Sequence, residues 1–152
     1  MRAGIIPYVK YKNKILYALG VDSVSGQLTD FGGRFDKKKD KNIKDTAIRE
    51  FREESLNVFG ILTIENIKPN LTFSLNNSTE TFVEIFVNPI KAKKEFIALK
   101  NNKYLLSEIS DICWLTEDQL EEIVIGNPFY NDKPVLPLYY KVRDAIKPFF
   151  LN

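Results

Sequence analysis

The chain has 152 residues, of which 44% are hydrophobic and 28% are charged, which is the composition of an ordinary globular protein. This length predicts a single domain over residues 1–152, and the net charge of +2 gives no sign of a DNA or membrane partner. The sequence has no His, which excludes Ser-His-Asp and Cys-His catalytic groups, HExxH sites and Cys/His zinc fingers.

The first half of the chain predicts a hairpin, a short strand and a helix. Two segments rich in branched and aromatic residues flank the polar KNK, which is typical of a tight turn. The short strand QLTDF leads into Gly32-Gly33. The predicted elements are strands over 3–11, 14–20 and 27–31, a polar, Lys-rich loop over 34–42 and a helix over 43–55.

The second half predicts further strands and two more helices. Thr116 has the hydroxyl of a helix N-cap, and acidic residues follow it where the helix dipole favours them. The predicted elements are extended segments over 61–67 and 71–75, a turn at 76–79, a strand over 80–90, a short helix or loop over 93–100, a strand over 111–115, a helix over 117–124 and a last helix over 138–146, opened by Pro137 and stopped before Pro148. Strands with interspersed helices predict an α/β or α+β fold.

The sequence contains no segment with the length and hydrophobicity of a membrane span. The apolar stretch near the N-terminus is short and is interrupted by Pro7, unlike a signal peptide. Cys113 is the only cysteine, which excludes an internal disulfide, and no basic neighbour in sequence activates its thiol. Together these features predict a cytoplasmic protein.

The helix predicted over 43–55 places three carboxylates on one stripe. With Glu50 at 0°, Glu53 lies at about 300° and Glu54 at about 40°, so all three share an arc of about 100°. Such like-charge neighbours each cost roughly a few tenths of a kcal/mol. One interpretation is a solvated face, since Arg49 and Glu53 form an opposite-charge pair. The other is a bound cation, and an all-oxygen ligand set favours Mg²⁺ or Mn²⁺.

The loop before this helix supports the second interpretation. Gly32-Gly33 ends a predicted strand, and glycine lets the backbone turn sharply and approach a ligand or ion closely. A plain turn would explain the glycines alone. The combination of strand, Gly-Gly, loop, helix and clustered carboxylates is more specific than either feature.

This combination resembles the Nudix hydrolase family. The family signature is Gly, five residues, Glu, seven residues and then Arg-Glu-apolar-any-Glu-Glu-any-Gly. REFREE, residues 49–54, matches the second half of the signature, and Gly33 matches its opening Gly. The segments GIIPYV, ILYALG, LTDFGG and ISDICWLTEDQL also resemble the family, so the resemblance covers most of the chain.

The sequence departs from the signature at two places. Lys41 occupies the position of the first Glu, and the loop is two residues longer than the signature allows. We expect Asp36 or Asp40 to replace the missing acid. Leu56 stands where the closing Gly belongs, and we expect Asn57 to end the helix one residue later.

The resemblance implies an α/β/α sandwich around a mixed sheet and Mg²⁺-dependent hydrolysis of a nucleoside diphosphate linked to another group. It implies that Glu50, Glu53 and Glu54 ligate the metal, with the carbonyl of Gly32 as a further ligand. Arg49 would hold the carboxylates in place.

The resemblance leaves the remaining roles less defined. Arg34 and Gly33 are the expected substrate-binding residues, and the lysines at 37–39 either attract phosphates or lie on a solvated loop. The general base stays open between Glu53, Glu84 and Glu108.

Several functions remain compatible with the sequence. The substrate of a pyrophosphohydrolase could be a free nucleotide derivative, a capped mRNA end or a diphosphoinositol polyphosphate. A rival is a catalytically inactive Nudix-shaped module that binds nucleotide or protein, although such modules usually lose acids that this chain retains. A third interpretation is a structural domain with a solvated acidic helix. A homodimer is left open.

Overall fold

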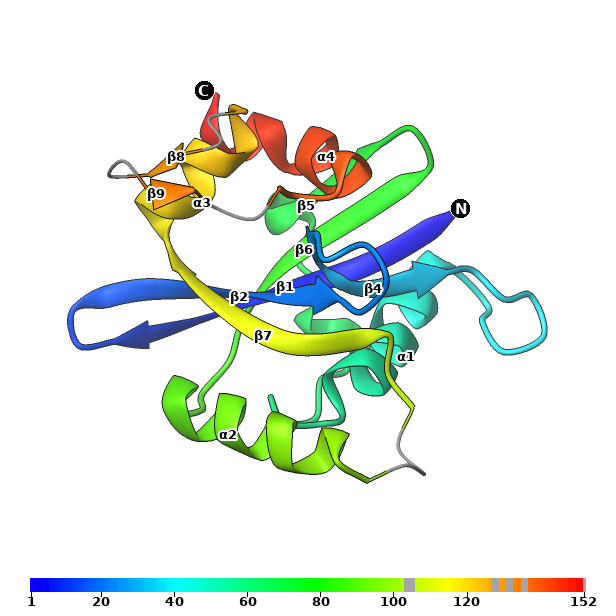
Figure 1. The fold of residues 1–152 in the computed structure, drawn as a ribbon. Helices are drawn as coiled ribbons and strands as arrows, with labels where there is room; N and C mark the ends of the chain where they lie inside the picture. Colours follow the sequence, from blue (N-terminus) through cyan, green and yellow to red (C-terminus); the bar gives the residue numbers. More distant parts are fainter. Residues whose placement is uncertain (103–105, 127–128, 131–132, 135–136, 152) are drawn as a thin grey trace.

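The computed structural model describes residues 1–102, 106–126, 129–130, 133–134 and 137–151 (Figure 1). A mixed seven-stranded sheet forms the centre of the described part. The strands are β1 (Arg2–Tyr11), β2 (Lys14–Asp22), β3 (Leu28–Thr29), β4 (Phe31–Arg34), β5 (Thr72–Leu75), β6 (Ser78–Glu84) and β7 (Ile109–Thr116), with a separate pair, β8 (Phe129–Tyr130) and β9 (Lys133–Pro134). The helices are α1 (Ile43–Ser55), α2 (Pro89–Lys100), α3 (Glu117–Val124) and α4 (Tyr140–Phe150), and two 3-10 turns are η1 (Ile64–Asn66) and η2 (Pro69–Leu71).

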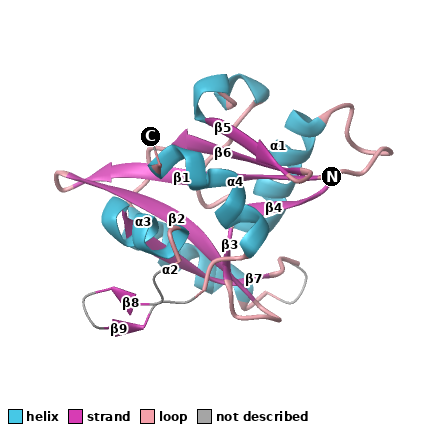
Figure 2. Ribbon diagram, turned by 90° about the horizontal axis from the view of Figure 1, so that it is seen from above, coloured by secondary structure: helices cyan, strands magenta, loops and turns pink. Residues whose placement is uncertain are grey.

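The predicted N-terminal hairpin is confirmed, and its strands separate beyond the turn. β1 and β2 pair from Tyr8↔Tyr17 to the turn, where Lys12 and Asn13 take positive φ angles. Away from the turn, β3 pairs with β2 and β4 pairs with β1. The segment β3–β4 therefore crosses between the two diverging strands, with Asp30 at the crossing point. β6 runs parallel to β1 on its other side, and β7 is antiparallel to β2 (Figure 2).

Helices cover both faces of the sheet, which confirms the predicted α/β/α sandwich. α1 and α2 lie on one face, and α3 and α4 lie on the other (Figure 1). Successive residues of β1 point to opposite faces, so Ile5 belongs to the core under α1 and α2, whereas Ile6 belongs to the core under α3 and α4. No helix of the described residues is long and apolar enough to cross a membrane.

The structure confirms the bounds of α1 and the Thr116 cap of α3, but it corrects the middle of the chain. The segment 61–67, expected to be extended, contains η1. The strand expected over 80–90 ends at Glu84. α2 then begins at Pro89, because the Asn88 side chain accepts hydrogen bonds from two backbone N–H groups and Pro is favoured at the first helical position.

The last helix also differs from its prediction. It begins at Tyr140 instead of directly after Pro137, and it continues through Pro148. Proline near a helix end removes one backbone hydrogen bond. Packing offsets this cost, because the Phe149 ring lies 4.6 Å from the Phe82 ring, centroid to centroid.

Candidate active site

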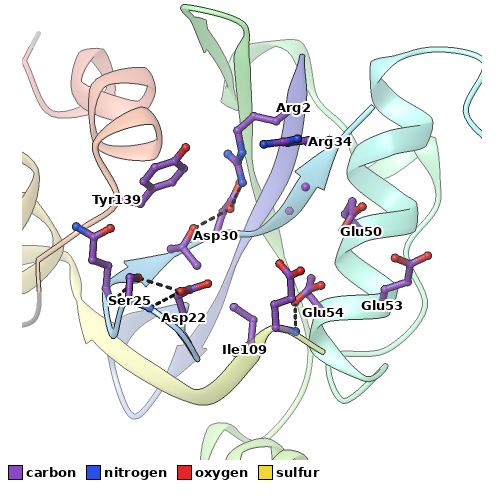
Figure 3. Close-up of a pocket in the computed structure, with 15 residues that line it drawn as sticks. Arg2, Asp22, Ser25, Asp30, Arg34, Glu50, Glu53, Glu54, Ile109 and Tyr139 are labelled. Carbon is purple, nitrogen blue, oxygen red and sulfur yellow. Dashed lines mark hydrogen bonds and ion pairs between the residues drawn. The ribbon is translucent and has the colours of Figure 1, made fainter. Parts of the chain in front are cut away.

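A cleft of about 710 Å³ crosses the end of the sheet where β1 and β4 pair. The carboxylates of α1 form one wall, and Tyr139, directly before α4, lies on the opposite side (Figure 3). The described residues that line the cleft are Arg2, Asp22, Ser25, Gln27, Thr29, Asp30, Gly32, Gly33, Arg34, Glu50, Glu53, Glu54, Glu108, Ile109 and Tyr139. Most of the residues predicted for the site from the sequence are therefore brought together.

Local interactions fix α1 beside β4. The Asn42 side chain caps the helix by accepting a hydrogen bond from the Asp45 N–H at 3.0 Å. On the buried face, the Phe51 ring packs edge-on against Phe31 of β4, with 6.3 Å between the ring centroids. Because the core face lies beside the acidic stripe, this packing directs Glu50, Glu53 and Glu54 to the cleft.

Glu50 lies over Gly33. A Cβ atom at position 33 would overlap the Glu50 carboxylate, so Gly33 leaves the space that this side chain occupies. Arg49 Nη1 donates to Glu50 Oε1 at 2.8 Å. Burial raises the pKa of Glu50, although Arg49 opposes that effect.

Glu54 is the most deeply placed of the three carboxylates and is 8% exposed. Its Oε2 accepts hydrogen bonds from the Glu108 backbone N–H at 2.9 Å and from the Ser107 hydroxyl at 3.2 Å. Burial raises the pKa of Glu54 to about 7, and the charges of Glu108 and Glu50 also raise it. The two hydrogen bonds therefore hold the Glu54 carboxyl group in a place where its ionised form is disfavoured.

Glu53 is the exposed member of the stripe, with 48% of its side chain accessible. Arg49 Nη1 lies 3.4 Å from Glu53 Oε2, so one guanidinium group contacts two of the three carboxylates. Arg49 Nη2 also donates to the backbone carbonyl of Arg34 at 3.0 Å. Arg49 therefore ties the helix to the end of β4.

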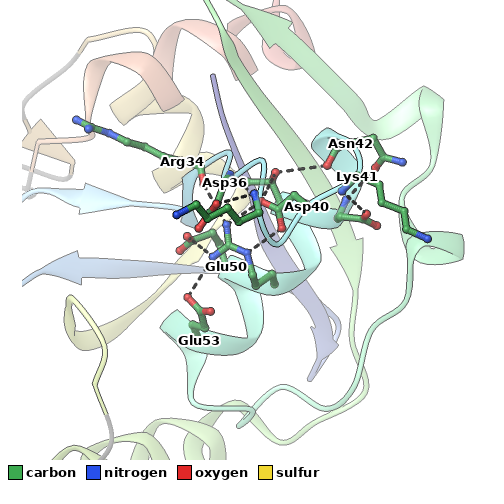
Figure 4. Close-up of polar contacts among 11 residues, drawn as sticks. Arg34, Asp36, Asp40, Lys41, Asn42, Glu50 and Glu53 are labelled. Carbon is green, nitrogen blue, oxygen red and sulfur yellow. Dashed lines mark hydrogen bonds and ion pairs between the residues drawn. The ribbon is translucent and has the colours of Figure 1, made fainter.

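Asp40 is the acidic residue of the predicted Lys-rich loop whose side chain contacts α1 (Figure 4). Arg49 Nε and Nη2 donate to the two Asp40 carboxylate oxygens, both at 2.8 Å. Asp36 instead accepts from the backbone N–H of Lys38 in its own loop. The side chain of Lys41 is exposed, and its backbone N–H donates to Asp45. Of the two expected replacements, Asp40 is the one that contacts Arg49.

The end of α1 corrects the expectation for the second departure. Leu56, and not Asn57, is the residue that ends the helix, and it adopts the left-handed conformation with φ 53° and ψ 32°. Asn57 follows with φ 62°. Glycine is the residue usually favoured in this left-handed turn, but here the chain uses Leu56. The Leu56 side chain packs against the core under α1.

The structure separates the candidates for the general base. Glu53 and Glu108 line the cleft. Glu84 does not, because it lies at the opposite end of β6, where it pairs with Tyr8 of β1 and its carboxylate is 3.7 Å from Lys10 Nζ. Glu84 is therefore too far from the cleft to act as the general base there.

Sequence reasoning missed a cluster of three largely buried charged residues at the cleft, Arg2, Asp30 and Glu80, of which Arg2 and Asp30 line it. Arg2 Nη2 donates to Asp30 Oδ1 at 2.6 Å, and Arg2 Nη1 donates to Glu80 Oε1 at 2.7 Å. Burial and the Asp30 charge raise the pKa of Glu80, whereas Arg2 keeps the pKa of Asp30 low despite its burial. The position of Asp30 just before Gly32-Gly33 could have indicated that it lies near the site. Nothing local in the sequence links Asp30 to Arg2 or Glu80.

The oxygen atoms of the α1 carboxylates and of Gly32 are the type of ligand that a hard divalent cation prefers. Within the described ranges, no group of three or more acidic or thiol side chains is arranged to hold an ion as it stands. Arg49 contacts Glu50 and Glu53, and the Glu108 N–H contacts Glu54. The carboxylates line one cleft with Gly32, and two have raised pKa values that a nearby positive charge would relieve.

Comparisons with known proteins place the fold. No protein-family model and no curated protein matches the sequence. Among solved structures, a Caenorhabditis elegans Ap4A hydrolase in a binary complex superposes with a TM-score of 0.60 and 17% identity over 98% of this chain and 95% of that chain. The Nudix domain of Shewanella oneidensis NrtR with ADP ribose superposes with a TM-score of 0.55 and 12% identity over 96% of this chain and 82% of that chain.

The NrtR of the same organism, complexed with a 27mer DNA, gives a TM-score of 0.54 and 15% identity. The match covers 99% of this chain but only 58% of that one. At these identities the comparisons establish the fold alone. The described residues adopt the fold of the Nudix hydrolases.

Proposed function

We propose that this chain is a hydrolase that cleaves a diphosphate linkage in a nucleoside diphosphate derivative, with Mg²⁺ or Mn²⁺ as cofactor. The observation that carries the proposal is the placement of Glu50, Glu53 and Glu54 along one wall of a cleft with Gly32 in its floor. Three carboxylates and a backbone carbonyl form an oxygen ligand set suited to these ions. When bound, the cation would neutralise phosphate charge and lower the pKa of an attacking water.

The residues around the stripe have positioning roles in this proposal. Arg49 orients Glu50 and Glu53, and Asp40 fixes Arg49 from the far side through two hydrogen bonds. Arg34 lines the cleft at the end of β4, where its guanidinium can pair with a phosphate. Glu53 and Glu108 are the acids in the cleft that could take the proton of the attacking water.

The opposite side of the cleft favours a nucleoside over an inositol group. Tyr139 offers an aromatic ring there, and Arg2 lies over that ring at 5.6 Å from its centroid. Nucleobases stack on aromatic rings and guanidinium planes. An inositol ring has no aromatic face and therefore cannot stack on Tyr139 in this way. A free nucleotide derivative and a capped RNA end both satisfy this chemistry.

A hydrolysis panel tests the proposal. Sugar nucleotides, dinucleoside polyphosphates, capped RNA and diphosphoinositol phosphates are incubated with Mg²⁺, Mn²⁺ or EDTA, and the products are identified by phosphorus NMR. We expect turnover of a nucleoside substrate that stops in EDTA and falls at least about 100-fold in Glu53→Gln. The matched control is Glu65→Gln, which removes an exposed acid from η1.

Two outcomes would contradict the proposal. Nucleotide binding without turnover by the wild type would indicate a binding module. Undiminished turnover in EDTA would exclude the cation.

A further inference from the structure

A second concave surface lies away from the cleft, between α2 and the strands β1, β2 and β7. It is a groove of about 530 Å³ that shares none of its described lining residues with the cleft. Its floor is apolar and is formed by Tyr11, Leu16, Pro89, Ile90, Ile97 and Trp114. Lys93 and Lys94 line its edge. Nothing in the proposed hydrolysis uses this surface.

α2 is apolar on two faces, although a surface helix needs only one. Ala92 and Phe96 are buried in the core under the sheet. Ile90 and Ile97, seven residues apart and so on one side of the helix, remain 53% and 40% exposed and line the groove. Large exposed apolar side chains that gather on one concave surface mark an interaction site, such as a protein-binding site or a ligand groove.

The edge of the groove is positively charged. α2 contributes Lys93 and Lys94, and the hairpin turn contributes Lys12, whose Nζ lies 5.3 Å from the centroid of the Tyr11 ring. Asp111 lies 3.7 Å from Lys93 and partly offsets this charge. Because the whole chain carries a net charge of only +2, these lysines form a local excess. The complementary partner has apolar side chains and carries negative charge.

We propose that this groove binds an acidic amphipathic segment of a partner protein. Its apolar side chains would pack on Ile90, Ile97 and Trp114, and its carboxylates would face the lysines of α2. Helical segments that present apolar residues at i, i+4 and i+7 are a common occupant of such grooves. The mostly aliphatic floor suits leucine-like side chains.

The same observations disfavour two other occupants. A two-fold dimer of this chain would bring the groove of one copy against its equivalent, and the lysines of both copies would repel one another. A single nucleic-acid strand binds through a positively charged groove that follows its backbone and through successive bases stacked on aromatic rings. Only Tyr11 and Trp114 offer rings among the described lining residues, and four of the others are aliphatic.

The only tryptophan of the chain is Trp114, so its fluorescence reports directly on the groove. The probe is a synthetic amphipathic peptide with Leu at i, i+4 and i+7 and Glu at the flanking positions. The control peptides replace Glu by Lys or Leu by Ser, and an oligouridine strand serves as the nucleic-acid probe. We expect a saturable fluorescence change with the acidic peptide alone.

Two variants locate the binding. Ile97→Asp and the double variant Lys93→Glu/Lys94→Glu should each weaken binding about tenfold or more, with unchanged hydrolysis of the diphosphate substrate. The matched control is Ile125→Asp, which changes an exposed apolar residue directly after α3, on the other face of the sheet. Equal binding of the Lys peptide, unchanged binding by Ile97→Asp, a response to oligouridine alone, or self-association in sedimentation that Ile97→Asp abolishes would each overturn the proposal.

Discussion

Replacement of Asp40 by Asn should destabilise the metal-free protein by about 2 to 3 kcal/mol. The Asp40 side chain is 1% exposed and accepts four hydrogen bonds, two from Arg49, one from the Thr46 hydroxyl at 2.9 Å and one from the Asp36 N–H at 3.0 Å. Asn keeps the shape but loses the charge and turns one acceptor into a donor that faces other donors. Loss of one partner from a buried pair costs about 3 to 5 kcal/mol, and the partial exposure of Arg49 reduces that figure.

The same substitution should lower activity, because Arg49 would lose the group that orients it beside Glu50 and Glu53. Changes to residues that position a metal ligand typically cost about 10- to 100-fold, and we expect a loss in that range. Hydrogen bonding to Arg49 also holds the pKa of Asp40 well below its usual range. A lowered carboxyl pKa contributes stability above the unfolded value that is lost as the pH falls, so the deficit of Asp40→Asn should shrink below about pH 4.

Urea denaturation at several pH values measures the stability difference, and the hydrolysis assay measures the second effect. Asp36→Asn is the matched control, since the Asp36 side chain accepts from the Lys38 N–H within its own loop and should cost less than about 1 kcal/mol. An Asp40→Asn variant with wild-type stability and activity would refute the assignment of Asp40 as the partner of Arg49.

Three further changes test the site. Lys41→Glu should alter turnover less than about tenfold, because this side chain is exposed outside the cleft, and a larger change in the rate would place it near the substrate. Glu54→Gln should stabilise the metal-free protein by about 0.5 to 1 kcal/mol at pH 8. Because the pKa of Glu54 is raised to about 7, wild-type stability falls as the pH rises from about 4.5 to 7, so melting at pH 5 should show no such gain. Gly33→Ala should displace the Glu50 carboxylate and reduce turnover at least about tenfold, with a small change in melting temperature; normal turnover would show that the close approach is dispensable.

Local patterns in the sequence were sufficient to predict the helix that carries the carboxylates. Its bounds follow from the Asn42 cap and from the buried Ala47, Ile48 and Phe51, all of which act within a few residues. The hairpin and α3 were predicted for the same reason. The prediction of the mixed sheet depended on the family resemblance, because the pairing of β1 with β6 joins residues more than 70 positions apart.

Features that depend on tertiary contacts were not predictable. The strand pattern around Glu84 gave no indication of which end of β6 reaches the cleft, and pairing with β1 places it at the far end. The contacts of Arg2 with Asp30 and Glu80 join residues 28 and 78 positions apart. The extension of α4 past Pro148 depends on the packing of Phe149 against the sheet, which outweighs the local preference of proline.

Mn²⁺ binding tests the central claim, that the carboxylate stripe of α1 holds a divalent cation. Electron paramagnetic resonance measures the free Mn²⁺ signal while the protein is titrated into the ion. We expect the wild type and Glu65→Gln to remove the free signal stoichiometrically, and the triple variant Glu50→Gln/Glu53→Gln/Glu54→Gln to leave it unchanged. Equal binding by the triple variant, or no binding by the wild type, would contradict the claim and favour a solvated acidic helix.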